Sequence, residues 1–239
     1  FRKIKDGYLD VCIAGGTEST VDEFTIGGFA NMKALTKCDV LEKASIPFDK
    51  DRSGFVLSEG CGILILEEFE HAKARGAKIY AEIVGYGATC DGYHMTSPMP
   101  TGEAAAMGMK FAMQEAGISP EDIDYINAHG TSTGLNDKYE TAAVKLALGE
   151  SAYKVKINST KSMTGHSLGA AGAIEAVVTS KSIKEGFIHA TVGTKETDEN
   201  CDLDYCINGN ISQEIRYALS NSLGFGGHNA TLCFKKVTE

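Results

Sequence analysis

The stretch from Ile157 to Gly172, INSTKSMTGHSLGAAG, restricts the possible folds of this chain more than any other. Its glycines and alanines have to be packed closely, and apolar residues at helical spacing follow it. We therefore expect His166 at or just before the start of a buried helix. Unpaired N–H groups at a helix start favour anions, so a neutral His166 is well placed to donate a hydrogen bond to an oxygen that gains charge during a reaction.

Composition narrows the class of protein. The 239 residues are 43% hydrophobic and carry a formal net charge of −9, which is typical of a globular α/β chain and argues against a nucleic-acid partner. No apolar run reaches the length of about 18 residues that a membrane span needs, so no membrane partner is expected. Seven cysteines without a CxxC pair, and the lack of a secretory signal, favour a cytoplasmic protein.

Helices and strands alternate through the middle of the chain. We expect helices at residues 103–116, 136–148 and 170–185, and strands at 123–128 and 155–159. This alternation predicts a sheet with parallel strands and helices on both faces. Near the C-terminal end, two further strands, at 217–221 and 230–236, flank the glycine-rich turn GFGGHN.

The beginning of the chain shows a related pattern. Strands are expected at 9–14 and 62–67, with GGTES as a turn after the first and a helical insertion over 21–43. This pair of apolar strands resembles the pair at the C-terminal end, which suggests an internal duplication. Residues 1–76 are then the end of a first half, and residues 77–239 are a complete second half.

Three polar motifs carry the candidate chemistry: NAHGTSTG at 127–134, KSMTGH at 161–166 and SNSLGFGG at 220–227. The first two follow strands, where ligands bind in α/β sheets, so His129 and His166 can meet over one cavity. A zinc site lacks a third ligand at the right spacing, and a phosphate-binding loop lacks its glycine pattern. The motifs favour two neutral imidazole donors that stabilise an enolate or thioester oxyanion. Lys161 is expected to supply the electrostatic field and to orient these donors.

The loop PFDKDRSGFVLSEGCG leaves two interpretations open. Its charged residues are Asp49, Asp51, Arg52 and Glu59, which could form a metal site or a salt-bridged structural loop. The arginine favours the salt-bridged loop. None of the seven cysteines is convincingly placed as a nucleophile, because those in apolar strands are expected to be buried.

The strings AGGTES, PFDKDRSGFVLSEGCG, NAHGTST, NSTKSMTGHSLGAAGA and NSLGFGGHNA together resemble the β-ketoacyl-[acyl-carrier-protein] synthases of bacterial fatty-acid synthesis. The resemblance covers nearly the whole chain. It implies an α/β thiolase-like fold, a five-layer αβαβα sandwich, of which the chain holds the complete C-terminal half and the end of the N-terminal half. It further implies a homodimer, and a catalytic cysteine that lies shortly before Phe1.

The resemblance also implies a reaction, the decarboxylative Claisen condensation of an acyl-enzyme with malonyl-acyl-carrier protein in fatty-acid elongation. His129, His166 and Lys161 match the family's catalytic residues. The implied partners are acyl carrier protein and acyl and malonyl thioesters, and no cofactor is expected. Two alternatives stay open: a polyketide ketosynthase, and a non-catalytic chain-length or dimerisation subunit, against which the retained histidines argue.

Two further groups of residues follow from the resemblance. Substrate-binding residues are Phe225 and Gly226, which lie in the turn that gates the acyl pocket, together with Thr131 and Thr133. A structural cation is implied at four other residues: Asn127, Glu175, Ser220 and Asn221. A buried hydrogen-bond network is an equal alternative for those four residues.

Overall fold

Helices and strands alternate along most of the chain, as the sequence predicts. The structure is a computed structural model that describes residues 1–238. The helices are α1 (Arg2–Lys5), α2 (Glu23–Asn31), α3 (Phe69–Ala74), α4 (Glu103–Ala116), α5 (Gly134–Leu148), α6 (Lys161–Thr164) and α7 (Leu168–Glu185). The strands are β1 (Val11–Glu18), β2 (Gly60–Glu67), β3 (Glu82–Cys90), β4 (Ile123–Asn127), β5 (Lys156–Asn158), β6 (Phe187–Ile188), β7 (Ile211–Ser212), β8 (Tyr217–Gly224) and β9 (His228–Lys235).

A five-stranded sheet in the order β3-β9-β8-β4-β5 forms the centre of the fold. β4 runs parallel to β5 and β8, whereas β9 is antiparallel to β8 and β3. The sheet is thus mixed: the parallel strands predicted from the alternation are β4 and β5, and the pair of strands predicted around GFGGHN is the antiparallel pair β8 and β9. β8 and β9 are joined by the short turn Phe225–Gly227, which is far too short for the crossover that a parallel pair needs.

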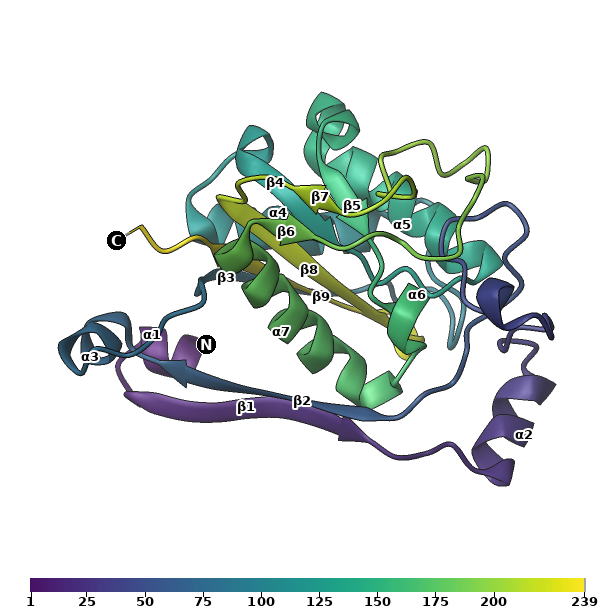
Figure 1. Cartoon of the computed structure of the whole chain (residues 1–239), viewed down its shortest axis with the longest axis horizontal. Helices are drawn as coiled ribbons and strands as arrows, with labels where there is room; N and C mark the ends of the chain where they lie inside the picture. Colours follow the sequence, from purple (N-terminus) through teal and green to yellow (C-terminus); the bar gives the residue numbers. More distant parts are fainter. Residues whose placement is uncertain (239) are drawn as a thin grey trace.

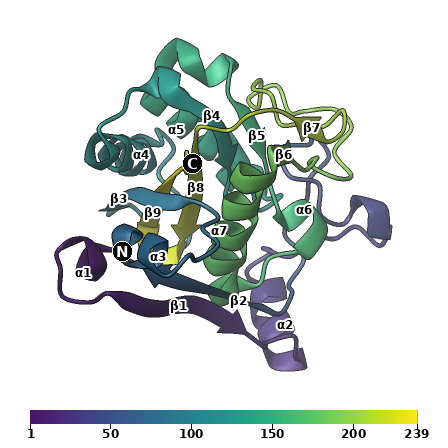
Figure 2. The ribbon, with the colours of Figure 1, turned by 60° about the vertical axis from the view of Figure 1, so that its left-hand side comes forward.

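Helices cover both faces of this sheet. α4 and α5 share a hydrophobic core with one face, and α7 packs on the other (Figure 2). The opposite side of α7 contacts β1 and β2, so this helix lies between the central sheet and a separate two-stranded antiparallel sheet (Figure 1). We call this β1–β2 pair the hairpin, although a long connection that includes α2 joins its strands. The order helix, sheet, helix, hairpin gives four of the five layers that the thiolase-like resemblance implies.

Close packing between α7 and the hairpin depends on glycine. A Cβ atom added at Gly16 would lie 2.3 Å from the carbonyl oxygen of Gly169, and one added at Gly62 would lie 2.5 Å from the backbone of Ala173. The small residues that follow His166 therefore lie where the backbones of helix and hairpin touch. The prediction that His166 lies just before a buried helix is confirmed, since α7 begins at Leu168.

The two hairpins repeat one arrangement. β1 pairs with β2 over eight antiparallel positions, and β8 pairs with β9 over eight as well. In the five-stranded sheet, β9 and β8 have β3 and β4 as outer neighbours, whereas β1 and β2 form a two-stranded sheet. This correspondence supports the expected duplication. The boundary predicted between residues 76 and 77 falls in the connection between α3 and β3 and stays a prediction.

Two details of the expected secondary structure are wrong. GGTES is not a turn, because β1 continues to Glu18, which pairs with Gly60. Of the insertion at 21–43, only α2 is α-helical, and a single 3₁₀ turn follows at Leu41–Lys43. Its chain turns away at Lys33, which adopts a left-handed φ of 56°, and the backbone of Thr36 then bonds to Phe55.

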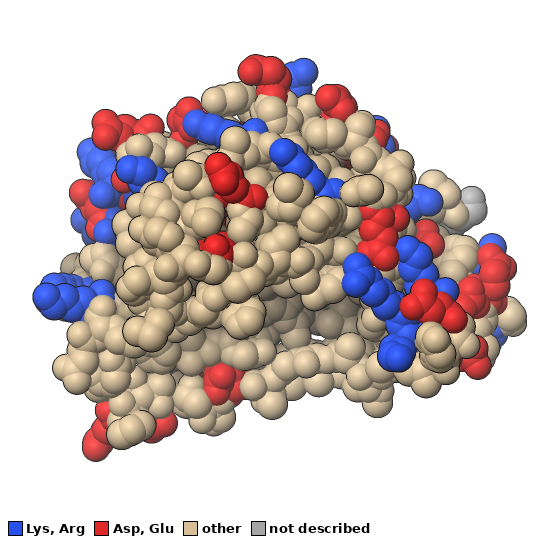
Figure 3. All heavy atoms as spheres, turned by 180° about the vertical axis from the view of Figure 1, so that it is seen from behind, with Lys and Arg blue, Asp and Glu red and all other residues tan. Residues whose placement is uncertain are grey.

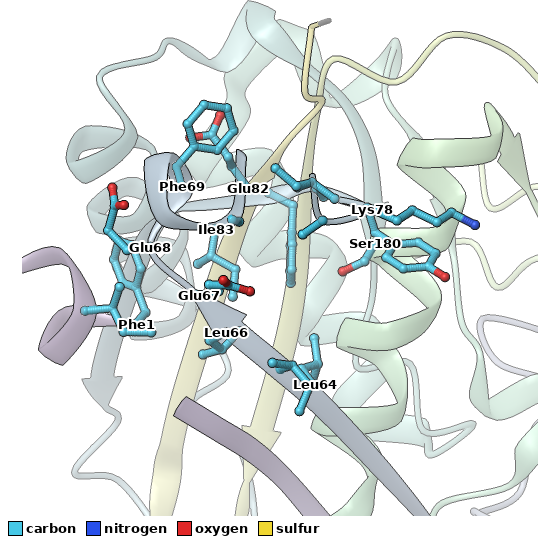
Figure 4. A pocket seen from close by; sticks show the side chains of 18 of the residues that line it. Phe1, Leu64, Leu66, Glu67, Glu68, Phe69, Lys78, Glu82, Ile83 and Ser180 are labelled. Carbon is cyan, nitrogen blue, oxygen red and sulfur yellow. The ribbon is translucent and has the colours of Figure 1, made fainter. Parts of the chain in front are cut away.

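The hairpin end of the molecule carries a groove of about 760 Å³. Leu64, Leu66, Phe69 and Ile83 are among the residues that line it (Figure 4). The face seen from behind has few charged side chains in its middle and a hollow above its lower edge (Figure 3). Within residues 1–238, no helix is both long and apolar enough to cross a membrane.

Gly87→Ala tests the close approach of β3 to α4. A Cβ at this position would lie 1.9 Å from the carbonyl oxygen of Gly108, so the helix has to move. We expect a loss of unfolding free energy of about 1–3 kcal/mol, the usual cost of overpacking, measured by urea denaturation of the full-length gene product. Gly27→Ala is the matched control, since nothing lies within 4 Å of its Cβ position. Equal midpoints for the two variants would contradict the packing argument.

Candidate active site

His129 lies directly beyond the end of β4, in a loop that is almost entirely buried. The backbone N–H groups of His129 and Gly130 each donate to Glu140, to its Oε1 and Oε2 at 2.8 Å. One carboxylate on α5 therefore holds two successive peptide groups of the loop. This bidentate grip fixes the loop where the chain turns from strand to helix.

Lys161 begins α6 and is 1% exposed. Its Nζ donates to the carbonyl oxygen of His129 at 2.7 Å and approaches the ring Nδ1 of His129 at 3.3 Å. It also forms an ion pair with Oε1 of Glu175, on α7. The lysine thus joins the two motifs that the sequence singles out, and its charge lies beside the first histidine.

His166 lies between α6 and α7, next to the loop that precedes β2. Its backbone N–H donates to Val56 at 2.7 Å, and its carbonyl accepts from Ser58 at 3.1 Å. The ring packs edge-on against Phe55 with 5.1 Å between centroids. The N–H of Leu168 donates to its Nδ1 at 3.2 Å. The ring is therefore held by the same helix start that the sequence predicts.

The two imidazoles face one another at 5.3 Å between centroids and an interplanar angle of 86°. In each ring Nδ1 lies against a donor, which is Lys161 for His129 and the Leu168 backbone for His166. A neutral ring that accepts at Nδ1 carries its proton on Nε2. Both histidines can therefore present an Nε2–H donor to an oxygen between them.

Burial keeps both rings neutral. Desolvation and then the nearby Lys161 charge lower the pKa of His166 to about 3, and the same causes hold the pKa of His129 well below its usual value. Burial raises the pKa of Glu175 to about 7, against the opposing effect of Lys161. The site thus combines two uncharged donors with one buried ion pair, a set suited to stabilising negative charge that develops on an oxygen.

The predicted substrate residues lie in two places. Thr131 and Thr133 follow His129 and share a hydrogen bond of 2.9 Å between their hydroxyls. Phe225 is half-exposed, and its ring lies 6.4 Å from Phe29 of α2. Gly226 has a φ of 78°, which favours glycine, and donates its N–H to the carbonyl of Met95 at 2.7 Å.

The four residues of the implied cation site are all buried. Asn127 Oδ1 and Glu175 Oε2 have no hydrogen-bond partner among residues 1–238. Asn221 differs, because its oxygen accepts from Thr231 at 2.8 Å and its NH₂ group faces Glu140. Ser220 is the register partner of Asn127 on β8. Two orphaned acceptor oxygens fit a bound cation, while Asn221 belongs to a hydrogen-bond network.

The loop at 46–55 is a salt-bridged structure. The buried guanidinium of Arg52 donates to the carbonyls of Asp49, Thr133 and Gly134 and to the carboxylate of Asp198. Within the described part of the chain, no cluster of three or more His, Cys, Asp or Glu side chains could hold a metal. Asp49 instead accepts backbone N–H groups, including that of Lys195 at 2.8 Å.

Sequence reasoning missed the carboxylates that hold the histidine loop. Asp137 accepts the backbone N–H groups of Ser132 and Phe48, and Glu140 those described above. Both lie on α5 at positions that look like ordinary exposed helix residues in GLNDKYET. Their spacing of three residues, which puts both on one helix face behind the histidine motif, was the available signal.

Comparisons with known proteins place the chain in a family. Sequence profiles described as Beta-ketoacyl synthase match it twice, with the N-terminal domain over residues 1–72 and the C-terminal domain over residues 80–195. The 3-oxoacyl-[acyl-carrier-protein] synthase 2 of Synechocystis is 52% identical over 237 residues, and that of Staphylococcus aureus strain COL is 50% identical over 236. The chain belongs to the β-ketoacyl synthase family. It covers 57% of the length of each of these relatives.

Solved structures show the same fold. A type II polyketide acyl-carrier protein in complex with its ketosynthase, bound to the hexaketide, matches with a TM-score of 0.97 and 44% identity over 99% of this chain and 59% of that one. The ishigamide ketosynthase/chain length factor matches with a TM-score of 0.91 and 39% identity, over 99% of this chain and 56% of that one. The predicted thiolase-like α/β fold is therefore confirmed.

His166→Gln should make the protein less sensitive to acid. Because the folded pKa of His166 is about 3 and the unfolded value about 6.5, the unfolded chain binds the extra proton between these values. The stability that neutral His166 contributes is therefore complete above pH 6.5 and is lost as the pH falls towards 3. The wild-type unfolding free energy should fall more steeply over this range, by up to about 1.4 kcal/mol per pH unit. Urea titrations at several pH values measure both slopes, and parallel slopes would contradict the burial argument.

Proposed function

We propose that this chain supplies the histidine and lysine part of a condensing active site, and that the intact protein elongates an acyl chain by decarboxylative Claisen condensation with malonyl-acyl-carrier protein. The observation that carries the proposal is the arrangement of the two neutral imidazoles of His129 and His166. Their ring centroids lie 5.3 Å apart, and a donor lies against Nδ1 of each ring. Such a pair suits an oxygen that becomes negative as the reaction proceeds.

In this mechanism the malonyl thioester oxygen accepts the Nε2–H groups of His129 and His166. Loss of carbon dioxide leaves the bonding electrons on the α-carbon and, by delocalisation, on that oxygen. The α-carbon then attacks the acyl thioester on the enzyme, a carbon–carbon bond forms, and the cysteine thiolate leaves. The rings need to transfer no proton in these steps, which fits their lowered pKa values.

Lys161 acts through His129 in this proposal. Its Nζ lies at the Nδ1 atom, so it keeps the Nε2–H tautomer and adds positive potential beside the forming enolate. Glu175 balances the lysine charge and holds the ammonium in place. The buried pair therefore serves orientation, at the desolvation cost that such pairs carry.

Substrate delivery is assigned to the turn at Phe225 and Gly226. Phe225 is half-exposed and reaches Phe29 across the gap to α2, which suits a side chain that opens and closes an acyl pocket. Thr131 and Thr133 are proposed to bind the incoming thioester arm beside His129. Acyl carrier protein is the proposed donor of both thioesters, and a homodimer the proposed assembly. The ketosynthase relative bound to an acyl-carrier protein supports that partner.

A bound monovalent cation is also proposed at Asn127 and Glu175, with Ser220 and the backbone nearby as further ligands. The support is the pair of buried acceptor oxygens that lack partners within residues 1–238. A cation there would keep Glu175 ionised, because positive charge opposes the effect of burial on its pKa. Its role would be structural.

Polyketide extension is the second candidate function. One of the similar solved structures is a type II polyketide ketosynthase, and another is a ketosynthase with a chain length factor. The histidine chemistry is the same for fatty acyl and polyketide substrates. The curated relatives from Synechocystis and Staphylococcus aureus, at 52% and 50% identity, carry the name 3-oxoacyl-[acyl-carrier-protein] synthase 2, which favours elongation of fatty acyl chains. A comparison of rates on saturated acyl and on polyketone thioesters separates the two.

His166→Ala in the full-length gene product tests the proposed function. Removing one of two donors to the enolate oxygen should slow malonyl decarboxylation by about 10²–10³-fold and leave acyl transfer from acyl-carrier protein to the enzyme nearly unchanged. Carbon dioxide release and mass spectrometry of the acyl-enzyme measure the two steps. His71→Ala is the control, since the side chain of that histidine is half-exposed and its ring pairs with Glu67. Equal losses in both steps would refute the assigned role.

Phe225→Ala tests the gate. Shortening this side chain should change the rate of acyl loading several-fold, while decarboxylation of malonyl thioester, which needs the histidines, stays within twofold of wild type. Single-turnover loading with acyl-carrier protein measures the first step. Tyr153→Ala, at an exposed aromatic residue distant in sequence from Phe225, controls for effects of removing any exposed aromatic side chain. An unchanged loading rate would remove Phe225 from the gate.

A further inference from the structure

His189 is a buried histidine that the proposed mechanism does not use. It follows β6 and is 9% exposed. Its Nδ1 lies 2.8 Å from the carbonyl oxygen of Ala190. A carbonyl oxygen can only accept, so Nδ1 carries the proton. Burial lowers the pKa of His189, and the ring is therefore neutral, with Nε2 left as an acceptor.

The next group in the network is Thr160, directly before Lys161. Its Oγ1 lies 3.1 Å from Nε2 of His189. Because this Nε2 has no proton, the threonine hydroxyl must be the donor in that contact. A hydroxyl has only one proton, so Oγ1 of Thr160 can only accept a hydrogen bond from any other neighbour.

The other neighbour is Asn127, at the end of β4. Its Nδ2 lies 2.9 Å from Oγ1 of Thr160. Since this oxygen can only accept, the Asn127 amide has to present its NH₂ group, and its Oδ1 is turned to the other side. The direction of one amide is thus set by the tautomer of a histidine two hydrogen bonds away.

The position of His189 is fixed independently of this relay. Asn158 Nδ2 donates to the carbonyl of His189 at 2.8 Å, and the hydroxyl of Tyr125 donates to Asn158 Oδ1 at 2.7 Å. Asn158 and Tyr125 are completely buried. The backbone of His189 is therefore held by a buried network, and the bond from its Nδ1 to the Ala190 carbonyl orients the ring towards Thr160.

We propose that His189 is a positioning residue which, through Thr160, holds the Asn127 amide with its oxygen free, so that the pocket offers two acceptors to a cation. The inference rests on the cation part of the proposed function. Its consequence is specific. Without an acceptor at position 189, the Thr160 hydroxyl can rotate and donate to Asn127 Oδ1 after the amide turns over, and the pocket then loses one ligand oxygen.

Thermal unfolding of the full-length gene product in potassium chloride and in choline chloride at equal ionic strength measures the cation effect. Specific binding to the folded state raises the midpoint with potassium concentration. We expect this rise in wild type and in His189→Gln, whose side-chain carbonyl can accept from Thr160. We expect its loss in His189→Phe, and in His189→Leu if the phenylalanine variant does not fold. Asn127→Leu should abolish the potassium-dependent rise of the midpoint. In the Asn127→Leu background, adding His189→Phe should then make no further difference to that rise.

A second measurement reports the amide directly. In protein labelled with ¹⁵N-asparagine, the side-chain NH₂ signal of Asn127, identified by its loss in Asn127→Asp, should keep its position in His189→Gln and move in His189→Phe. Thr160→Val should remove that response, while Thr160→Ser, which keeps the hydroxyl, should preserve it. A signal that moves equally in His189→Gln and His189→Phe, or still responds in Thr160→Val, would overturn the positioning role.

The two measurements separate the possible failures. If wild type shows no potassium-specific rise, the cation assignment is wrong, and the NMR comparison still decides whether His189 orients Asn127. If the rise is present and is unchanged in His189→Phe, the cation assignment holds and the role of His189 is refuted. Condensation activity is not needed for either conclusion.

Discussion

The contact between the Lys161 ammonium and the His129 loop is the interaction on which the site depends. One nitrogen reaches the carbonyl oxygen and the ring of His129 and the carboxylate of Glu175, so it joins β4, α6 and α7 at a single point. A lysine that is 1% exposed is tolerated only because these acceptors replace its water shell. Its charge adds to the effect of burial, which is the larger cause, in lowering the pKa of both nearby imidazoles.

Electrostatics and packing lead to the same geometry around the histidines. Glu140 fixes the backbone of the loop that carries His129, while the start of α7 and Phe55 fix the ring of His166. Two backbone N–H donors at Glu140 offset part of the cost of burying that carboxylate, although burial still raises its pKa. The site is therefore organised in advance by groups that need not touch a substrate.

Much of the fold and the histidine pair could be predicted from the sequence. The period of the apolar residues located α4, α5 and α7. The motif strings located His129 beyond β4, and Lys161 and His166 between β5 and α7. The length of β1 was underestimated, because GGTES has turn-forming residues whose pairing with β2 depends on contacts more than 40 residues away in the sequence. The spacing of Asp137 and Glu140 hinted at a shared helix face, but local sequence does not tell a buried carboxylate from an exposed one. The role of His189 could not be predicted, because its contact with Thr160 joins residues 29 positions apart.

The location of α7 between two sheets has a consequence for how the site forms. This helix carries Glu175, follows His166, and touches both the hairpin and the central sheet. His166 is further tied to Val56 and Ser58, more than 100 residues earlier in the chain. The site therefore has high contact order, and its donors come together only when distant segments have closed around one helix. A chain in which only the central sheet has formed lacks the contacts with Phe55, Val56 and Ser58 that hold His166 beside His129.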